Sequence, residues 1–175
     1  MSELSVAIRR ERRDDYDRVF EIEERAFGQP DEALLVAALR GKVDPEISLV
    51  AATQDERDAQ RLIGHIYFSP VKVGPALRRA IALGPVAVDP DYQGRAVGSQ
   101  LCLRGLQACA EIGEALVFVL GHPNYYPQFG FVSARSKDLF YKSEEFDAAF
   151  FVAELTADAA NGYSGEVVYA PQFDV

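Results

Sequence analysis

The sequence has few of the residues that form cross-links or bind metals. Its 175 residues include no tryptophan, one methionine, two cysteines and two histidines. Cys102 and Cys109 lie seven positions apart in an expected helix, which sets their Cα atoms about 10 Å apart, beyond disulfide reach. Neither His65 nor His122 has other ligand-type residues at the spacing of a metal site. The sequence therefore predicts no disulfide and no metal centre.

Basic residues are scarce relative to acidic ones. The chain has 18 Lys and Arg against 27 Asp and Glu, a net charge of −9. This excess works against phosphate backbones and anionic lipid, so we expect neither a nucleic-acid nor a membrane partner. No run of about 18 apolar residues occurs, and the N-terminal residues Met1 to Ser5 do not begin a signal peptide. A reduced, cytoplasmic protein is the expectation.

Hydrophobic residues make up 49% of the chain, enough for a core without cross-links. The length predicts one domain over residues 1–175. A strand, a tight loop, a helix and a strand follow one another between residues 79 and 120, which predicts a right-handed βαβ unit within an α/β fold with a mixed sheet. Gly84 and Pro85 interrupt the first of these strands and predict a bulge or a splayed edge. The expected strands cover residues 5–10, 47–53, 61–73, 79–88, 115–120, 150–155 and 166–170, the expected helices cover 14–27, 30–40 and 97–112, and a polar loop is expected over 133–147.

Periodicity assigns faces to some of these elements. At about 100° per residue, Glu23 falls near the centre of the apolar stripe of the first helix, which predicts a carboxylate directed at the core. Such a group is a candidate general base or a carboxylate that is paired inside the fold. The second helix is expected to bury Leu34, Leu35, Ala38 and Leu39. On the strand over 61–73, alternation places Ile63, His65 and Tyr67 on one face, and we interpret His65 as a hydrogen-bonded sheet residue rather than a catalytic one.

A loop of small residues joins the strand that ends at Val88 to the helix that begins near Val97. Small side chains let backbone N–H groups approach a ligand, and a helix N-terminus adds about half a positive charge, so the loop is suited to bind an anion. It is neither the nucleoside-triphosphate loop, because no Gly-Lys-Ser/Thr follows, nor the dinucleotide fingerprint, because Gly-x-Gly-x-x-Gly is absent. Taken alone, it is also compatible with an ordinary strand–helix turn.

With its flanks, residues 83–101, the loop resembles the acetyl-CoA-binding segment of GNAT-type N-acetyltransferases. The Gln/Arg-x-x-Gly-x-Gly/Ala signature of that family falls on Gln93 to Gly98, with Ala96 at one of its glycine positions. Residues 117–131 are similar to the second half of the same fold in the YhbS group of bacterial acetyltransferases, with His122 in place of their usual aspartate. The resemblance implies a GNAT fold: a mixed, mostly antiparallel, twisted sheet that is splayed at its centre and has helices on both faces.

The resemblance also implies roles for individual residues, with acetyl-CoA as the cosubstrate. Backbone groups of one strand segment pair with the pantetheine arm, and N–H groups of the loop hold the pyrophosphate, with Arg95 adding a positive charge. Asn124 bonds the pantetheine amide. Tyr126, in the family's Tyr-x-x-x-Gly-Phe pattern, protonates the departing thiolate. The implied cosubstrate-binding residues are Val86, Ala87, Val88, Gln93, Gly94, Arg95, Ala96, Val97, Gly98, Ser99, Asn124 and Tyr126.

The sequence thus predicts an N-acetyltransferase that moves acetyl from acetyl-CoA to a primary amine by direct transfer in a ternary complex. Tyr126 is the candidate acid and Glu23, with Glu24 behind it, the candidate base. The amine belongs to a small molecule or a peptide, and the protein is expected to be a monomer or a homodimer. The competing hypothesis is a regulatory domain that binds acyl-CoA without turnover.

Overall fold

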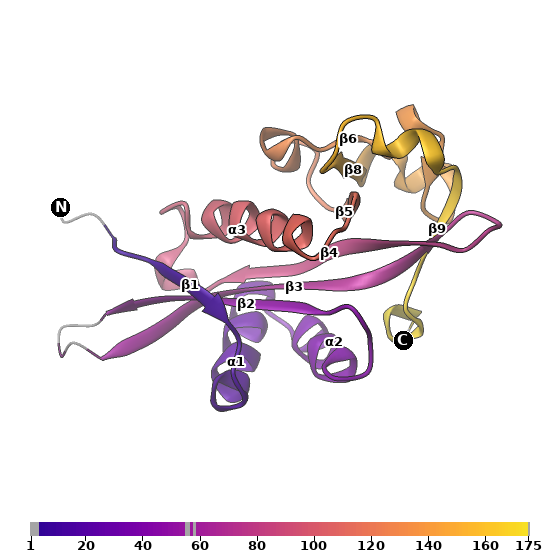
Figure 1. Cartoon of the computed structure of the whole chain (residues 1–175). Coiled ribbons are helices and arrows are strands. Elements are labelled where there is room, and N and C mark those ends of the chain that lie inside the picture. The colour runs from indigo at the N-terminus through magenta and orange to yellow at the C-terminus, as the bar shows by residue number, and fades with distance from the viewer. Residues whose placement is uncertain (1–3, 55–56, 58, 175) are drawn as a thin grey trace.

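The computed structural model describes residues 4–54, 57 and 59–174, so residues 1–3 of the N-terminal segment discussed above lie outside the described residues (Figure 1). Nine strands and three α-helices are assigned within these residues. The helices are α1 (Tyr16–Phe27), α2 (Asp31–Leu39) and α3 (Val97–Glu111). The strands are β1 (Ala7–Arg10), β2 (Ile47–Gln54), β3 (Gln60–Val73), β4 (Arg78–Val88), β5 (Leu116–Leu120), β6 (Val132–Ser133), β7 (Leu139–Phe140), β8 (Phe150–Glu154) and β9 (Gly165–Tyr169).

The sheet is mixed and mostly antiparallel, as predicted. Its main path runs β1-β2-β3-β4-β5-β8-β6, while β9 pairs with β3 and β7 pairs with β9. Only the β4–β5 and β7–β9 pairs are parallel among the described strands. The parallel β4–β5 pair is joined through α3, which confirms the expected βαβ unit.

Helices cover both faces of the sheet (Figure 1). On one face, Val19 and Ile22 of α1 pack with Val50 and Ala87 of the sheet. On the other face, α3 packs against β2, β3 and β4, and the bare Cα of Gly105 leaves room for the Phe68 ring. The sheet therefore separates two cores.

The sheet opens between β4 and β5. Their pairing runs from Ile81 to Leu83 and stops there, because Gly84 and Pro85 follow on β4. Opposite these two residues the β3–β4 register shifts between Ile66 and Phe68, while β4 stays paired with β3 up to Val88. The splay predicted at Gly84-Pro85 is confirmed, and it leaves one edge of the last β4 residues open.

Three expectations about the fold are wrong in detail. Helix α2 buries Ala33, Val36 and Leu39, whereas Leu34 is 55% exposed; the helix is apolar on almost every side, so periodicity cannot choose its inner face. A register shift between Ala51 and Ala52 moves Ile63 to the α3 face, away from the expected companions His65 and Tyr67. The expected polar loop over 133–147 contains β7 and short 3-10 turns.

Candidate functional site

A groove with a volume of about 780 Å³ occupies the splay between β4 and β5. Its floor is formed by β4 from Leu83 to Val88 and by the end of β5, and its walls come from α1, α2, the start of α3 and the C-terminal segment. Predicted site residues that line it are Val86, Ala87, Val88, Gln93, Gly98 and Tyr126, together with His122 and Tyr125. Segments far apart in sequence therefore meet at the opening that Gly84 and Pro85 create.

The open edge of β4 offers unpaired backbone groups to this groove. The amide of Asp89 donates to the Ile63 carbonyl of β3 at 2.8 Å, and Ala87 lies opposite His65. Because antiparallel pairing alternates along a strand, the N–H groups of Val86 and Val88 face away from β3, toward the groove. The Gln93 side-chain amide donates to the Val88 carbonyl at 3.0 Å and occupies that acceptor. An extended ligand carrying amide groups can add to this edge as a strand would.

The N-terminus of α3 lies at one end of the groove. Its first intrahelical bond runs from the Gln100 amide to the Ala96 carbonyl at 3.1 Å, so the amides of Val97, Gly98 and Ser99 have no partner within the helix. Arg95 is exposed and has no ion-pair partner within the described chain. The side chain of Val97, by contrast, is buried in the core, so only its backbone is available. Free amides and the helix dipole together suit an anionic ligand.

Ala96 caps α3 in the left-handed region, with φ 63° and ψ 17°. A Cβ is disfavoured there by about 1–2 kcal/mol. We therefore expect Ala96→Gly to raise the free energy of unfolding by up to about 1 kcal/mol. The relieved backbone strain is partly offset by the conformational entropy that glycine adds to the unfolded chain. Chemical denaturation measures this change, and a variant less stable than wild type would contradict the assigned backbone conformation.

Two adjacent tyrosines close the groove on the β5 side. Tyr126 is 7% exposed, and its ring is held by edge contacts with Tyr125 and Phe131 at centroid distances of 5.1 and 5.7 Å. A methyl group on Gly121 would overlap the Tyr126 ring, so this glycine permits its position. Burial raises the pKa of the Tyr126 hydroxyl above its usual range, and the neighbouring Cys102 and Tyr125 add to the rise. The phenol is therefore a proton donor over the whole neutral and mildly alkaline range.

The hydroxyl of Tyr125 points elsewhere. It lies beside the start of α3, where a Cβ on Gly98 would approach it to 3.0 Å, and it interacts with the side chains of Ser99 and Cys102. Asn124 is exposed on the preceding turn and is not among the residues that line the groove. The structure thus brings Tyr126 and the β4 edge together and leaves Asn124 outside the groove.

Asp89, the residue directly after the strand that ends at Val88, had no role predicted from the sequence. Its carboxylate is fully buried and accepts hydrogen bonds from Arg18 at 2.7 Å, Arg25 at 3.1 Å and the Asp91 amide at 3.0 Å. Asp89 therefore ties α1 to the loop that leads into α3. Burial alone would raise the pKa of this carboxyl, but the Asp91 amide and the two guanidinium groups hold it below 3.8, its ordinary value. The only feature of the sequence that could have indicated this role is the position of an acidic residue directly after a strand.

Asp89→Asn is expected to destabilise the fold by about 2 kcal/mol at neutral pH, because two cations lose their shared partner while remaining partly solvated. A carboxyl with a lowered pKa contributes stability above the unfolded value of 3.8 and loses it as the pH falls through the folded value. The wild-type protein should therefore lose stability below about pH 4 more steeply than the variant. Asp91→Asn, whose side chain is 64% exposed, is the matched control and should change little. Equal denaturation curves for Asp89→Asn and wild type would contradict this assignment.

Glu23 is directed at the core, as predicted, and is paired there. Its side chain is 0% exposed, and Oε1 lies 2.6 Å from Nδ1 of His65. Burial raises the pKa of the carboxyl above its ordinary value; His65 opposes this effect, while Glu32 and Glu11 add to it. Glu23 does not itself line the groove, but Ala26 and Phe27, one turn later on α1, do. His65 is bonded through both ring nitrogens, which confirms the prediction of a hydrogen-bonded sheet histidine.

The cysteines offer no nucleophile. Cys102 and Cys109 are free and fully buried, and burial raises the pKa of each thiol to about 12.

Over the described ranges, no cluster of three or more His, Cys, Asp or Glu side chains is arranged to hold a metal ion. The described helices are also too short or too polar to cross a bilayer. The groove is lined by Glu32, His122, Tyr125 and Tyr126, whose side chains can transfer protons.

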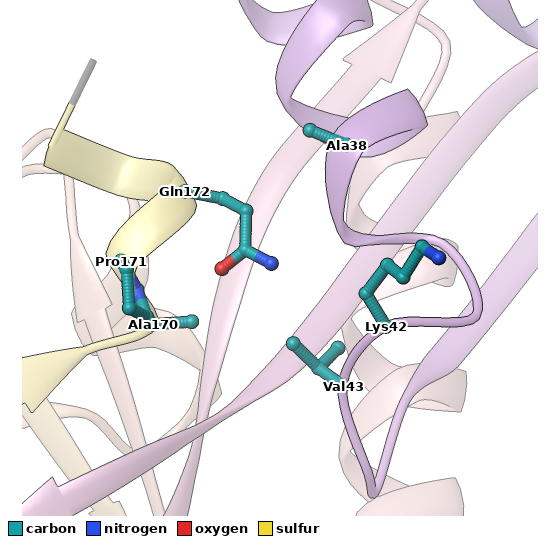
Figure 2. A pocket seen from close by; sticks show the side chains of 6 residues that line it. All are labelled: Ala38, Lys42, Val43, Ala170, Pro171 and Gln172. Carbon is teal, nitrogen blue, oxygen red and sulfur yellow. The ribbon is translucent and has the colours of Figure 1, made fainter.

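A second hollow of about 500 Å³ lies between the end of α2 and the C-terminal segment (Figure 2). Six residues line it: Ala38, Lys42, Val43, Ala170, Pro171 and Gln172. Lys42 is the one ionisable side chain among these six, so the hollow provides no acid–base pair. The groove between β4 and β5 remains the candidate active site.

Comparisons with known proteins identify the family of the chain. A family model described as an acetyltransferase (GNAT) domain matches residues 7–134. The chain is 38% identical over 150 residues to the uncharacterized N-acetyltransferase YhbS of Escherichia coli strain K12, covering 86% of this chain and 87% of YhbS. It is 36% identical over 152 residues to the uncharacterized N-acetyltransferase YjhQ of the same strain, covering 82% of this chain and 81% of YjhQ.

Solved structures of similar proteins contain the expected cosubstrate. The crystal structure of E. coli YhbS in complex with CoA superposes with a TM-score of 0.88 at 33% identity, covering 100% of this chain and 95% of that one. A GNAT family acetyltransferase from Brucella melitensis in complex with acetyl-CoA gives a TM-score of 0.76 at 32% identity, covering 97% and 99% of the two chains.

Proposed function

Because the chain belongs to the GNAT acetyltransferase family, we propose that it is an N-acetyltransferase that moves the acetyl group of acetyl-CoA directly to a primary amine. One observation carries the proposal: a single groove joins the open edge of β4, the N-terminus of α3 and the buried phenol of Tyr126. The first two features suit a long anionic thioester that contains amide groups, and the third suits a leaving thiolate.

Acetyl-CoA binds along the floor of this groove in the proposed arrangement. The free N–H groups of Val86 and Val88 pair with the pantetheine arm or polarise the thioester carbonyl. The amides of residues 93–99 hold the pyrophosphate, and Arg95 adds a positive charge at the rim. Asn124, which lies outside the groove, contacts pantetheine only if the arm extends toward its turn. No metal takes part in this scheme.

The amine attacks the thioester carbonyl, forming the C–N bond and breaking the C–S bond. Tyr126 donates its proton to the thiolate as it leaves. A phenol whose pKa is raised by burial stays protonated until that moment. Glu23 is the proposed base. Its side chain is buried between α1 and the sheet and does not line the groove, so it accepts the proton from outside the groove wall.

Carboxylates and aromatic rings on the acceptor side favour a cationic amine with an apolar body. Glu32 lines the groove together with Phe27 and Leu35, and Tyr141, Tyr169 and Phe173 form a wall of rings with centroid distances of 5.2 and 4.9 Å. An adjoining hollow of about 530 Å³ adds Asp31 to the same rim. The carboxylates attract an ammonium group, and the rings pack against the apolar remainder of the acceptor.

Free-thiol release from acetyl-CoA, measured over a panel of amines, tests the activity. The proposal expects amine-dependent thiol release that is fastest for cationic amines with apolar substituents and slower for acidic amines. Tight acetyl-CoA binding without turnover on any amine would instead favour the competing function, a regulatory acyl-CoA-binding domain.

A further inference from the structure

A series of hydrogen-bonded polar side chains runs from Glu23, next to the groove, to an edge of the sheet. Glu23 Oε1 lies 2.6 Å from His65 Nδ1, and His65 Nε2 lies 2.8 Å from Ser48 Oγ. Ser48 Oγ donates to Glu11 Oε2 at 2.8 Å, and Arg40 donates to both oxygens of Glu11 at 2.5 and 3.1 Å. This series begins at Glu23 and His65, which are fully buried, and ends at Glu11 and Arg40, whose side chains are 4% and 15% exposed.

The hydrogen bonds fix where the protons lie. Two bonds from Arg40 identify Glu11 as an ionised acceptor, so the Ser48 hydroxyl must direct its single proton to Glu11. Ser48 can then only accept from His65, which places a proton on Nε2. The 2.6 Å contact between Glu23 Oε1 and His65 Nδ1 requires one further proton, carried by either atom. The donors from His65 Nε2 onward thus point toward Glu11.

One end of this chain is free to accept a proton. Glu23 Oε2 is buried and has no hydrogen-bond partner within the described chain. Ala26 and Phe27, on the same helix one turn later, line the groove, as does Ala87, which lies opposite His65 in the β3–β4 ladder. Glu23 and His65 therefore lie on elements that also contribute residues to the wall of the groove.

On the premise of the proposed acetyltransferase function, we propose that Glu23, His65, Ser48 and Glu11 form a proton relay that carries the proton released by the acceptor amine to solvent beside Arg40. The overall reaction at neutral pH converts an ammonium and acetyl-CoA into an amide, CoA thiol and one free proton. The thiol takes its proton through Tyr126, so one proton remains that must leave the site.

The steps of the relay balance. The amine N–H bond breaks and a bond forms to Glu23 Oε2, which leaves the shared proton on His65 Nδ1. The Nε2 proton passes to Ser48 Oγ, and the original Ser48 proton passes to Glu11 Oε2. Glu11 then loses this proton to solvent. One proton enters and one leaves, with no change in the net charge of the protein. The relay then holds protons on Glu23 Oε2 and His65 Nδ1, and the resting arrangement returns when the Glu23 carboxyl and the Ser48 hydroxyl rotate and His65 exchanges its tautomer.

The surroundings favour this direction of transfer. Glu32 on α2 and Glu11 lie near the Glu23 carboxyl and favour arrival of a proton, while Arg40 is ion-paired with Glu11. Tyr67 is the other polar ring near His65, at a centroid distance of 6.3 Å, and its hydroxyl is committed to Glu46. Tyr67 and Glu46 form a separate hydrogen bond beside the relay and provide an internal control.

Ser48→Ala removes the middle of the relay and leaves both candidate catalytic residues and the groove intact. At pH 7 we expect kcat about tenfold or more below wild type, with the Kd of acetyl-CoA unchanged within about twofold. The deficit should shrink as the pH rises toward the pKa of the acceptor, because a neutral amine releases no net proton. Ser48→Thr, which keeps the hydroxyl, should restore kcat, and Glu11→Gln should reproduce the loss if Ser48→Ala does not fold.

The matched control is Glu46→Gln, the same change at a carboxylate outside the relay, which should keep the wild-type pH profile. A second readout needs no turnover: nitrogen NMR of His65 should show Nε2 protonated and a strongly deshielded proton toward Glu23, with the Nε2 signal altered by Ser48→Ala. A wild-type protein that is active, together with Ser48→Ala and Glu11→Gln variants of unchanged kcat and pH profile, would overturn the relay. A wild-type protein without amine-dependent thiol release would instead overturn the proposed function.

Discussion

Tyr126→Phe is expected to lower kcat at least about 100-fold while leaving the Kd of acetyl-CoA within about twofold. The variant keeps the ring, and with it the packing against Tyr125, Phe131 and the bare Cα of Gly121. Only the proton donor is lost, so the thiolate must leave unprotonated. Because the pKa of this hydroxyl lies above its usual value of 10.0, the wild-type rate should show no loss of the acid below about pH 10.

Tyr125→Phe is the matched control for this prediction. Its hydroxyl lies beside Gly98 and Ser99 at the start of α3, so its loss should weaken acetyl-CoA binding and change kcat little. Steady-state rates and calorimetric binding separate the two patterns. An unchanged kcat in Tyr126→Phe with a large loss in Tyr125→Phe would transfer the acid role to Tyr125.

Gly98→Val is expected to raise the Kd of acetyl-CoA at least about 100-fold, a loss of about 2.7 kcal/mol. Gly98 lines the groove, and a Cβ there would already meet the Tyr125 hydroxyl at 3.0 Å and Val88 Cγ2 at 3.6 Å. The branched side chain would therefore project into the space next to the free amides of α3. The affinity for acetyl-CoA would fall because the valine side chain clashes with the ligand and because the ligand loses its contacts with these backbone amides.

Gln100→Val places the same side chain two residues later, at an exposed position of α3. It should leave acetyl-CoA binding near the wild-type value, which separates the steric effect from any change in helix propensity. Equal affinities for Gly98→Val and wild type would show that the ligand does not lie against this turn of α3.

Local sequence features predicted the splay and the burial of Glu23 because each depends on a few neighbouring residues. Gly84 and Pro85 interrupt ladder pairing wherever they occur in a strand, and the spacing of apolar residues on α1 fixes where Glu23 points. The family resemblance was carried by residues 83–131, and its expected fold is confirmed.

The partners of Glu23 were not predictable because they come from distant segments. His65 lies 42 positions away and Ser48 is on another strand, and no periodicity relates the faces of different elements. A register shift that moves Ile63 to the opposite face is equally invisible in an alternating pattern. The role of Asp89 was not predictable either, because its arginine partners on α1 precede it by 71 and 64 positions.

The burial of both thiols supports the proposed direct transfer. The two thiols are fully buried, with pKa values raised to about 12, and neither lines the groove, so an acetyl-cysteine intermediate has no route to form. In the proposed mechanism both substrates occupy the groove together, acetyl-CoA along β4 and the amine on the side of Glu32.

An initial-rate matrix, in which acetyl-CoA and an active amine are varied together, tests this account most directly. The account predicts intersecting double-reciprocal lines, one acetylated amine per thiol released, and no mass increase of the protein after incubation with acetyl-CoA alone. Parallel lines together with a covalently acetylated protein would contradict it.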